Sequence, residues 1–474
     1  MAQLSRKGFG YGAAVSIIIG SIIGSGIFMK PAAMASQVAS PTWLIIVWVI
    51  AGLFSLFGSL IYAEVGSMIP ENGGNYVYFR HMYGDFTAFL YGWAAFTAIN
   101  TASVSAIAFV CAAYANFFLD LPKFPPEIEK DFLLHIPFLG NFYPLANFGV
   151  KSLAIFLIIV LTVLNYISTR GSSALQVIST VIKVFVISAL IFGILFSGGG
   201  ETQNLFTPSV NPKEGWQLLG GFIAALTGAF MAYEGWINLT FVAGEVREPQ
   251  KNIPRSLIAG VVVCIAIYVL VNIAYLYVLP VDEMKNSKLV ASDAIRVALG
   301  STSEAIIAAM IVICTLGAVN GNVMSIAYVT YAMARDGRFM KWAGKDHPRF
   351  KTPGNALVLH GILASLFVIS GTFDILSDMY VFASWIAYLL GAIGLFILRK
   401  KMPDANRPYK VFGYPYVPLL FILFASFYVV STIVNDINNY VNGTVPVINS
   451  VFGLAIIAAG APLYWYFKAK YPKG

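Results

Sequence analysis

Three small residues, Gly24, Ser25 and Gly26, interrupt an apolar run that extends over residues 11–38. The run is otherwise long enough to cross a bilayer as one helix, but glycine and serine are poor helix formers when they stand together near its middle. Non-helical backbone persists in a membrane only where it is buried in protein or lines a water-filled cavity. The pattern therefore predicts a helix break whose free backbone groups bind a ligand. Close helix packing on Gly20 and Gly24 would use the same residues and is the alternative.

A second interruption lies in the sixth apolar run, where Glu234 and Gly235 follow Phe230, Met231 and Tyr233. A carboxylic acid in the middle of a membrane helix is costly and usually functional, although Glu234 could also pair with a buried cation for structure alone. The two breaks lie five spans apart, so spans 1–5 and 6–10 would run through the membrane with opposite topology. Interrupted helices at corresponding positions of two inverted halves indicate a transporter site near the midplane.

The ends of the broken helices predict the class of ligand. At the first break, the N–H groups of Ser25, Gly26 and Ile27 would lie at a helix N-terminus, which favours a carboxylate. At the second break, the carbonyl groups around Met231 and Tyr233 could accept hydrogen bonds from an ammonium group. An anion site that faces a cation site suits the α-carboxylate and the α-amine of an amino acid.

The composition identifies an integral membrane protein. Of the 474 residues, 58% are hydrophobic and 11% are charged, whereas soluble domains average about 25% charged residues. Cys111, Cys264 and Cys314 fall inside apolar runs and the four histidines are scattered, so we expect no disulfide framework, metal site or cofactor. We also expect no enzyme, because no cluster of catalytic residues occurs at one depth. The net charge of +8 reflects the bias of the loops, and no nucleic-acid partner is expected.

The expected fold class is an all-α integral membrane protein with about twelve transmembrane helices. We expect one domain over residues 1–474, with a first five-helix repeat at 11–197, an inverted second repeat at 216–398 and two further helices at 415–467. The expected spans are 11–37 (broken), 42–68, 86–118, 148–168, 174–197, 216–243 (broken), 254–279, 303–334, 355–372, 375–398, 415–435 and 447–467.

The distribution of positive charge predicts the orientation. Of the 30 Lys and Arg residues, 21 fall in segments on the side of the N-terminus and 8 in segments on the other side. Because cytoplasmic loops carry the excess of positive charge, we expect both termini in the cytoplasm of a multi-pass protein of the inner or plasma membrane.

Several motifs occur in order between about residues 11 and 415. They are Gly24-Ser-Gly-Ile-Phe28, Tyr62-Ala-Glu-Val-Gly66 followed by Ile69-Pro-Glu-Asn-Gly-Gly-Asn-Tyr76, Ala232-Tyr-Glu-Gly-Trp236, Gly244-Glu-Val-Arg-Glu-Pro-Gln-Lys-Asn-Ile-Pro254, Ala334-Arg-Asp-Gly337 with Thr352-Pro353, and Leu398-Arg-Lys-Lys-Met-Pro403 with Arg407-Pro408. With these motifs the chain resembles the amino acid–polyamine–organocation (APC) transporters, and within them the L-amino-acid transporter (LAT) family. The resemblance implies the inverted repeat, alternating access, and either exchange of amino acids or their proton-coupled uptake.

The chain departs from the family pattern at two positions of the second break. Family members commonly have an aromatic gate where Met231 stands, so Met231 could admit a different side chain, or Phe230 could serve as the gate. Several relatives have glycine where Glu234 stands, so this carboxylate could favour cationic substrates or could turn away from the site. The loop between spans 3 and 4 lacks the cysteine that joins eukaryotic members to a glycoprotein. We therefore expect a free-standing, prokaryotic transporter without a disulfide-linked partner subunit.

Lys183 lies in the fifth span on the same helix face as Gln176 and Thr180. A lysine at this depth must face protein or water. It is similar to the lysine that sodium-independent relatives place where others hold sodium, and it could bridge the carbonyl groups near Gly20 and Ser21 to the eighth span. A fixed cation is favoured over a lysine that carries a proton during transport. For the walls that contact the substrate side chain, the resemblance implies spans 3, 8 and 10, with candidates Asn100, Ser103 and Ser384.

The sequence as a whole predicts a secondary active transporter of L-amino acids, in the first place a sodium-independent exchanger of neutral amino acids. A proton-coupled symporter and a transporter of cationic amino acids are the alternatives within transport. A channel or an amino acid sensor of the same fold is the alternative outside it.

Overall fold

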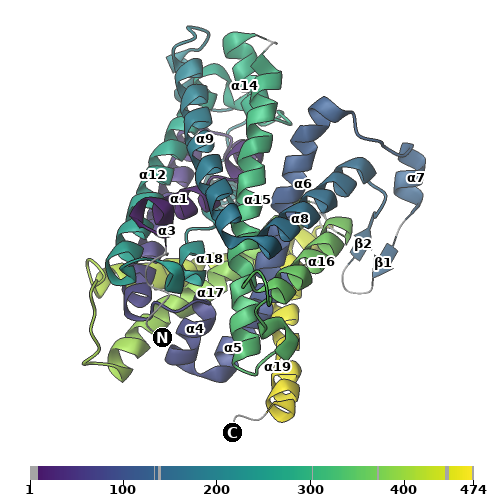
Figure 1. Ribbon diagram of the computed structural model, residues 1–474. Helices are drawn as coiled ribbons and strands as arrows, with labels where there is room; N and C mark the ends of the chain where they lie inside the picture. Colours follow the sequence, from purple (N-terminus) through teal and green to yellow (C-terminus); the bar gives the residue numbers. More distant parts are fainter. Residues whose placement is uncertain are drawn as a thin grey trace.

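The computed structural model describes residues 9–132, 134–136, 140–300, 303–370, 373–443 and 448–471. Long helices dominate this part of the chain and pack side by side in one bundle (Figure 1). Among the described residues, ten helices are long and apolar enough to cross a membrane, and a bent pair near the start of the chain provides an eleventh span. The chain is therefore a multi-pass membrane protein.

The spanning elements follow the predicted order. They are the bent pair α1 (Tyr11–Ile22) and α2 (Gly26–Val38), then α3 (Pro41–Met68), α5 (Asp85–Ala94) continued by the π-helical turn η1 (Ala95–Ile99) and α6 (Asn100–Leu119), α8 (Phe148–Ile167), α9 (Thr169–Leu195), α10 (Gly215–Tyr233), α12 (Pro249–Val278), α15 (Ser303–Arg335), α17 (Phe373–Lys401), α18 (Tyr416–Val441) and α19 (Asn449–Lys470). The apolar helix α16 (Gly354–Ser370) takes the ninth predicted position but is shorter than the others. With α16 included, the predicted order of twelve apolar segments is confirmed.

The predicted interruption of the sixth span, 216–243, is present at Glu234 and Gly235. Helix α10 ends at Tyr233, and after a turn only the four-residue helix α11 (Asn238–Phe241) and the 3-10 turn η3 (Ala243–Glu245) follow. The backbone of Glu234 is extended and Gly235 has a φ of 108°, a conformation that glycine adopts at little cost. The helix therefore stops at Glu234, and the part of the span after the break consists of short helical turns.

The two breaks lie against each other. The axes of α1 and α2 are bent by 40° at the first break. A Cβ atom on Gly26 would lie 2.4 Å from the Cα atom of Ala232, and one on Gly235 would lie 2.7 Å from the carbonyl oxygen of Ser21. These two glycines therefore allow the interrupted backbone of one half of the chain to touch that of the other.

Short elements connect the spans: α4 (Asn75–Tyr83), α7 (Pro126–Asp131), α13 (Val281–Met284), α14 (Val290–Leu299), η2 (Thr202–Leu205) and η4 (Lys341–Gly344). The prediction of an all-α fold holds for the spanning elements but missed two strands. Strand β1 (Leu134–Ile136) pairs antiparallel with β2 (Gly140–Phe142), and Figure 1 shows both beside α7, projecting from the bundle.

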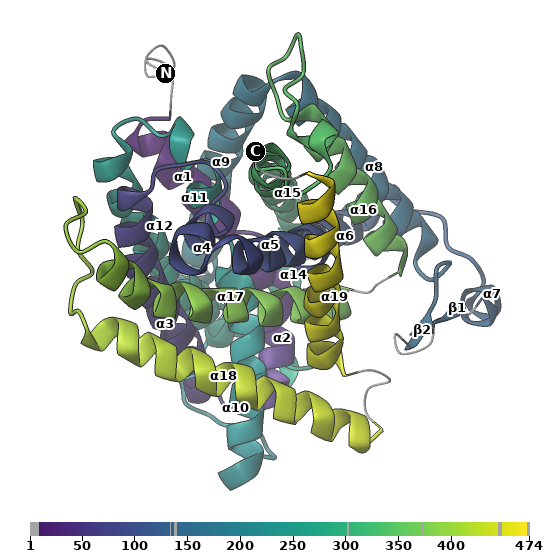
Figure 2. The same cartoon turned by 90° about the horizontal axis from the view of Figure 1, so that it is seen from below.

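The last two helices lie at the periphery of the bundle (Figure 2). Helix α18 packs along α17 and α3, and α19 packs along α5 and α17. The predicted division into repeats at 11–197 and 216–398 stays a prediction. The cytoplasmic position of both termini also stays a prediction, and the terminal residues 1–8 and 472–474 lie outside the described residues.

Candidate substrate site

A cavity lies between the two helix breaks. Its wall combines the segment between α1 and α2, the segment between α10 and α11, and faces of α6, α15 and α17. The predicted residues in this wall are Gly24, Ser25, Gly26, Asn100, Ser103, Met231, Glu234 and Ser384, together with Ser21. The fold thus brings most of the predicted site residues, which come from distant parts of the sequence, to one place.

The N-terminus of α2 presents unpaired amides at this cavity. The N–H groups of Phe28 and Met29 both donate to the carbonyl oxygen of Ser25, at 3.1 Å each. Among the described residues, no backbone acceptor is found for the amides of Ser25, Gly26 and Ile27. A helix N-terminus with free amides carries a partial positive charge and is suited to binding a carboxylate.

The C-terminus of α10 presents carbonyl groups at the opposite side. The carbonyl oxygen of Met231 accepts a hydrogen bond from the N–H of Glu234 at 3.3 Å and from the hydroxyl of Tyr380 at 3.4 Å. The carbonyl oxygen of Ala232 lies 2.9 Å from the hydroxyl of Tyr268. The carbonyl end of a helix is electronegative, so this segment is suited to an ammonium group.

Tyr268, on α12, contacts both breaks with one hydroxyl group. Its oxygen lies 2.7 Å from the carbonyl oxygen of Ile22 and 2.9 Å from that of Ala232. Because a hydroxyl has a single hydrogen, it donates to one of these oxygens at a time. The sequence analysis missed Tyr268, since a single tyrosine in an apolar helix has no pattern that distinguishes it from a core residue.

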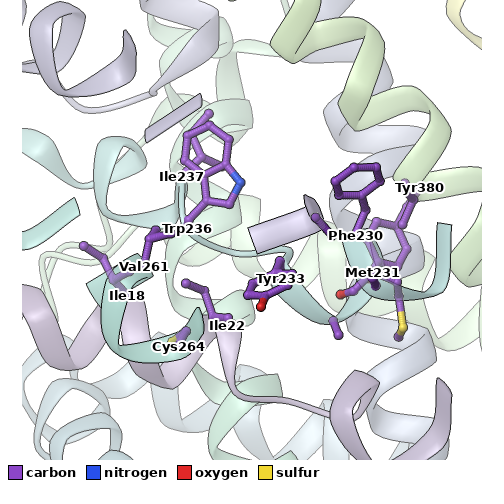
Figure 3. Close-up of a cluster of buried hydrophobic side chains, with 14 of the residues drawn as sticks. Ile18, Ile22, Phe230, Met231, Tyr233, Trp236, Ile237, Val261, Cys264 and Tyr380 are labelled. Carbon is purple, nitrogen blue, oxygen red and sulfur yellow. The ribbon is translucent and has the colours of Figure 1, made fainter. Parts of the chain in front are cut away.

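Three predicted residues turn their side chains away from the cavity. Ile27 is fully buried, and the Phe230 ring packs on Trp385 with a centroid distance of 4.1 Å. The hydroxyl of Tyr233 donates to the carbonyl oxygen of Trp48 at 3.1 Å. Figure 3 shows Phe230 and Met231 beside Tyr380, with Tyr233 on the other side near Ile22. Only the backbone groups of these three residues remain available for a ligand. The placement of the Phe230 ring against Trp385 does not support a role for Phe230 as a gate.

Glu234 lies in the wall of the cavity and has a partner on α17. The hydroxyl of Tyr388 donates a hydrogen bond to its Oε1 atom. Tyr388 and Tyr380 both line the cavity as well, and neither was singled out from the sequence. Glu234 is therefore held toward α17 without leaving the site.

Lys183 is fully buried and binds the first break directly. Its Nζ atom donates to the carbonyl oxygens of Gly20 at 2.6 Å and of Ile23 at 2.8 Å. The predicted partner Gly20 is correct, whereas the second carbonyl belongs to Ile23 and not to Ser21. The difference arises because α1 ends at Ile22, so the first carbonyl beyond the helix is that of Ile23. On the α15 side, the stem of Lys183 packs close to Gly317.

The described residues contain no group of three or more His, Cys, Asp or Glu side chains that could hold a metal ion.

Comparisons with known proteins agree with this geometry. A family profile described as "Amino acid permease" matches residues 9–461. The chain is 30% identical over 470 residues to the "Serine/threonine exchanger SteT" of Bacillus subtilis (strain 168), covering 98% of each protein. It is also 30% identical to the human "b(0,+)-type amino acid transporter 1", over 91% of this chain and 83% of that protein. The human "Cystine/glutamate transporter" is 30% identical over 96% of this chain and 83% of its own length.

Proposed function

Because this chain belongs to the amino acid permease family and is a transporter of amino acids, we propose that it exchanges neutral amino acids without sodium, by alternating access. The observation that carries the proposal is the pair of facing helix ends in one cavity. The free amides of Ser25, Gly26 and Ile27 would bind the α-carboxylate of the substrate. The carbonyl groups at the end of α10, around Met231, would bind its α-amine. Every amino acid has an α-carboxylate and an α-amine, so this part of the site would recognise amino acids in general and not one particular side chain.

Lys183 supports independence from sodium. Its ammonium group lies against two carbonyl oxygens of the first break, which are groups of the kind that would otherwise ligate a cation. A tethered charge at this position performs the structural role of an ion without being released in each cycle. Exchange is favoured over net uptake because one of the relatives is itself named an exchanger.

A second candidate, transport of cationic amino acids, is favoured by Glu234. Its carboxylate borders the cavity and could attract a positively charged side chain. The hydrogen bond from Tyr388 occupies one of its oxygens, which favours the neutral class. Proton-coupled uptake is the further alternative, with Glu234 or Lys183 as the group that carries the proton.

Counter-flow in proteoliposomes tests these proposals together. Vesicles are loaded with unlabelled alanine, leucine, arginine or glutamate, and each labelled amino acid is offered outside in sodium-free buffer. We expect rapid uptake only when a neutral amino acid is inside. Preference for arginine would favour the cationic class, and uptake into empty vesicles under a proton gradient would favour symport. Flux without stimulation from the opposite side would indicate a channel, and the absence of flux would indicate a sensor.

Three further proposals concern the partner subunit, the kind of activity and the location of the protein in the cell. A free-standing transporter is supported by the loop between α6 and α8, residues 120–147, which contains no cysteine to bond to a second subunit. The chemistry is transport and not catalysis of a reaction. The protein would reside in the inner or plasma membrane with both termini in the cytoplasm.

A further inference from the structure

Three polar side chains in the wall of the cavity have buried atoms without a hydrogen-bond partner among the described residues. They are both the Oδ1 and the Nδ2 atoms of Asn75, the Nδ2 atom of Asn100 and the hydroxyl of Ser384. The side chains are 0%, 5% and 1% exposed, respectively, and all three line the cavity. Unpaired polar groups of this kind are rare inside proteins, because each one loses its hydrogen bonds to water without replacement.

The three residues come from separate elements and converge at the cavity. Asn75 is the first residue of α4, Asn100 begins α6 directly after the π-helical turn η1, and Ser384 lies on α17. Helix α4 is not a spanning element, so Asn75 approaches the cavity from the connection between α3 and α5. The side chain of Asn75 interacts with Tyr62 and Tyr91, and the hydroxyl of Tyr62 has no hydrogen-bond partner of normal geometry among the described residues.

These groups require a partner that can both donate and accept hydrogen bonds. The amide of Asn75 offers one acceptor and donors, the Nδ2 atom of Asn100 offers donors, and the hydroxyl of Ser384 can act in either way. The charged α-groups of an amino acid are assigned to the two helix ends. The group that pairs with Asn75, Asn100 and Ser384 is therefore the substrate side chain.

We propose that this cavity selects amino acids whose uncharged side chain both donates and accepts hydrogen bonds, an amide or a hydroxyl, over apolar side chains of the same shape. The inference rests on the proposed function, since it assigns the side-chain part of the same site. An apolar side chain would displace water from Asn75, Asn100 and Ser384 and leave their polar atoms unpaired. Sites built around hydrogen bonds reject analogues that lack them far more strongly than apolar pockets reject a small difference in size.

Isosteric pairs of substrates test the inference in the unmodified protein. Asparagine is compared with leucine, and threonine with valine, in counter-flow under saturating internal alanine. We expect kcat/KM to be at least about tenfold higher for the polar member of each pair. Equal rates within either pair, or preference for the apolar member, would overturn the inference while leaving amino acid exchange established. If no amino acid exchanges at all, the proposed function fails and the inference fails with it.

Two variants assign the effect to residues. In N75L and N100L the preference for asparagine over leucine should fall at least about fivefold, because the unpaired amide is replaced by an apolar group of similar shape. The control is N355L, whose native Nδ2 atom donates to the carbonyl oxygen of Trp342 outside the cavity, and it should keep the wild-type ratio. The ratio is measured within each variant, so a lower amount of folded protein does not affect it. An unchanged ratio in both N75L and N100L would overturn the assignment.

Discussion

Lys183 introduces a positive charge into the bundle and places it against the first helix break. The two carbonyl oxygens that it binds lie at the point where the hydrogen bonds of α1 end, so they have no partner from a continuing helix. A single side chain on α9 thereby stabilises the interrupted backbone on which the proposed carboxylate site depends. Tyr268 adds a second contact from α12 to the same region.

Replacement of Lys183 should separate transport from folding. We expect K183M to lower exchange at least about tenfold, because the carbonyl groups of Gly20 and Ile23 lose their donor and the segment Ile23–Ser25 is no longer held. Removal of a buried charge offsets part of the lost hydrogen-bond energy, so the Tm should change by only a few degrees. Counter-flow and a thermal melt in detergent are the two measurements.

Lys151 provides a matched control for this variant. It is also a buried lysine whose Nζ atom binds carbonyl oxygens, those of Tyr143 at 2.8 Å, Pro144 at 3.3 Å and Ile369 at 3.1 Å, but it lies outside the cavity. K151M should lower stability and leave the exchange rate per folded molecule near that of the wild type. Wild-type exchange by K183M would remove the role assigned to Lys183.

A carboxylate outside the membrane-spanning segments predicts a dependence of stability on pH. Asp282 accepts hydrogen bonds from the Lys285 ammonium, the Ser209 hydroxyl and the Val210 amide, and these lower its pKa to about 2. Because the folded pKa lies below the unfolded value of about 3.9, the contribution to stability is complete above that value and is lost as the pH falls through about 2.

The substitution D282N removes this contribution. Its Tm should lie below that of the wild type at pH 7, and the difference should shrink as the pH is lowered from about 4 toward 2. Melting curves of both proteins across this range provide the measurement. A difference that stays constant with pH would mean that the asparagine acts through packing and not through charge.

At the scale of elements, the breaks depend on glycines, because neighbouring backbone occupies the space that a Cβ atom would take at these positions. The contact of Gly26 with Ala232 joins the start of α2 to the end of α10.

Charged side chains join other elements on the side of the bundle where α4 and α5 lie. Asp336, just after α15, accepts from Tyr76 at 2.9 Å and pairs with Arg80, and Arg338 pairs with Asp85 at 2.8 Å. These pairs connect α15 to α4 and α5 and would have to break if that side opens.

Addition of one methyl group at Gly26 should disrupt the contact between the breaks. In G26A the new Cβ atom would lie 2.4 Å from a backbone atom of Ala232, which cannot move without moving α10. We expect a loss of stability of about 1–3 kcal/mol and at least about tenfold slower exchange. The readouts are a thermal melt and counter-flow.

The control lies in the same span, at the second residue of α1. A Cβ atom on Gly12 meets no atom within 4 Å, so G12A should transport normally. Since alanine is the better helix former, G12A should be equal to the wild type in stability or higher by about 0.5–1 kcal/mol. If G26A behaves like G12A, close approach of the two breaks is not required for transport.

At the scale of the whole molecule, the bundle divides into an inner set of helices around the cavity and an outer pair. The cavity is lined by residues of α1, α2, α4, α5, α6, α10, α11, α15 and α17, whereas α18 and α19 pack outside them (Figure 2). The three native cysteines are all buried in the bundle, which leaves the surface free of reactive thiols among the described residues.

This property allows a direct test of orientation by labelling single introduced cysteines. K123C lies between α6 and α8 and K345C lies after α15, both at exposed positions. In intact cells a membrane-impermeant thiol reagent should label K123C at once and K345C only after permeabilisation. The reverse pattern would place both termini outside. Wild-type protein, with Cys111, Cys264 and Cys314 buried, should stay unlabelled in both cases.

The sequence by itself determined the class of the protein, the order of the spans and the position of the first break. These follow from local causes, since apolar runs of about 20 residues must span and clustered small residues must interrupt a helix. Charge at mid-membrane depth likewise marked Lys183 and Glu234 as residues that need a partner.

The tertiary structure alone decided which partners these residues have. The Lys183 ammonium binds the carbonyl oxygen of Ile23 and not that of Ser21, and the Tyr388 hydroxyl binds Glu234. Tyr268 contacts both breaks although no local pattern marks it, and Asn75 lines the cavity although its motif assigned it no role. Periodicity reports which face of a helix is apolar, but the partner across the bundle depends on packing between segments that lie far apart in the chain.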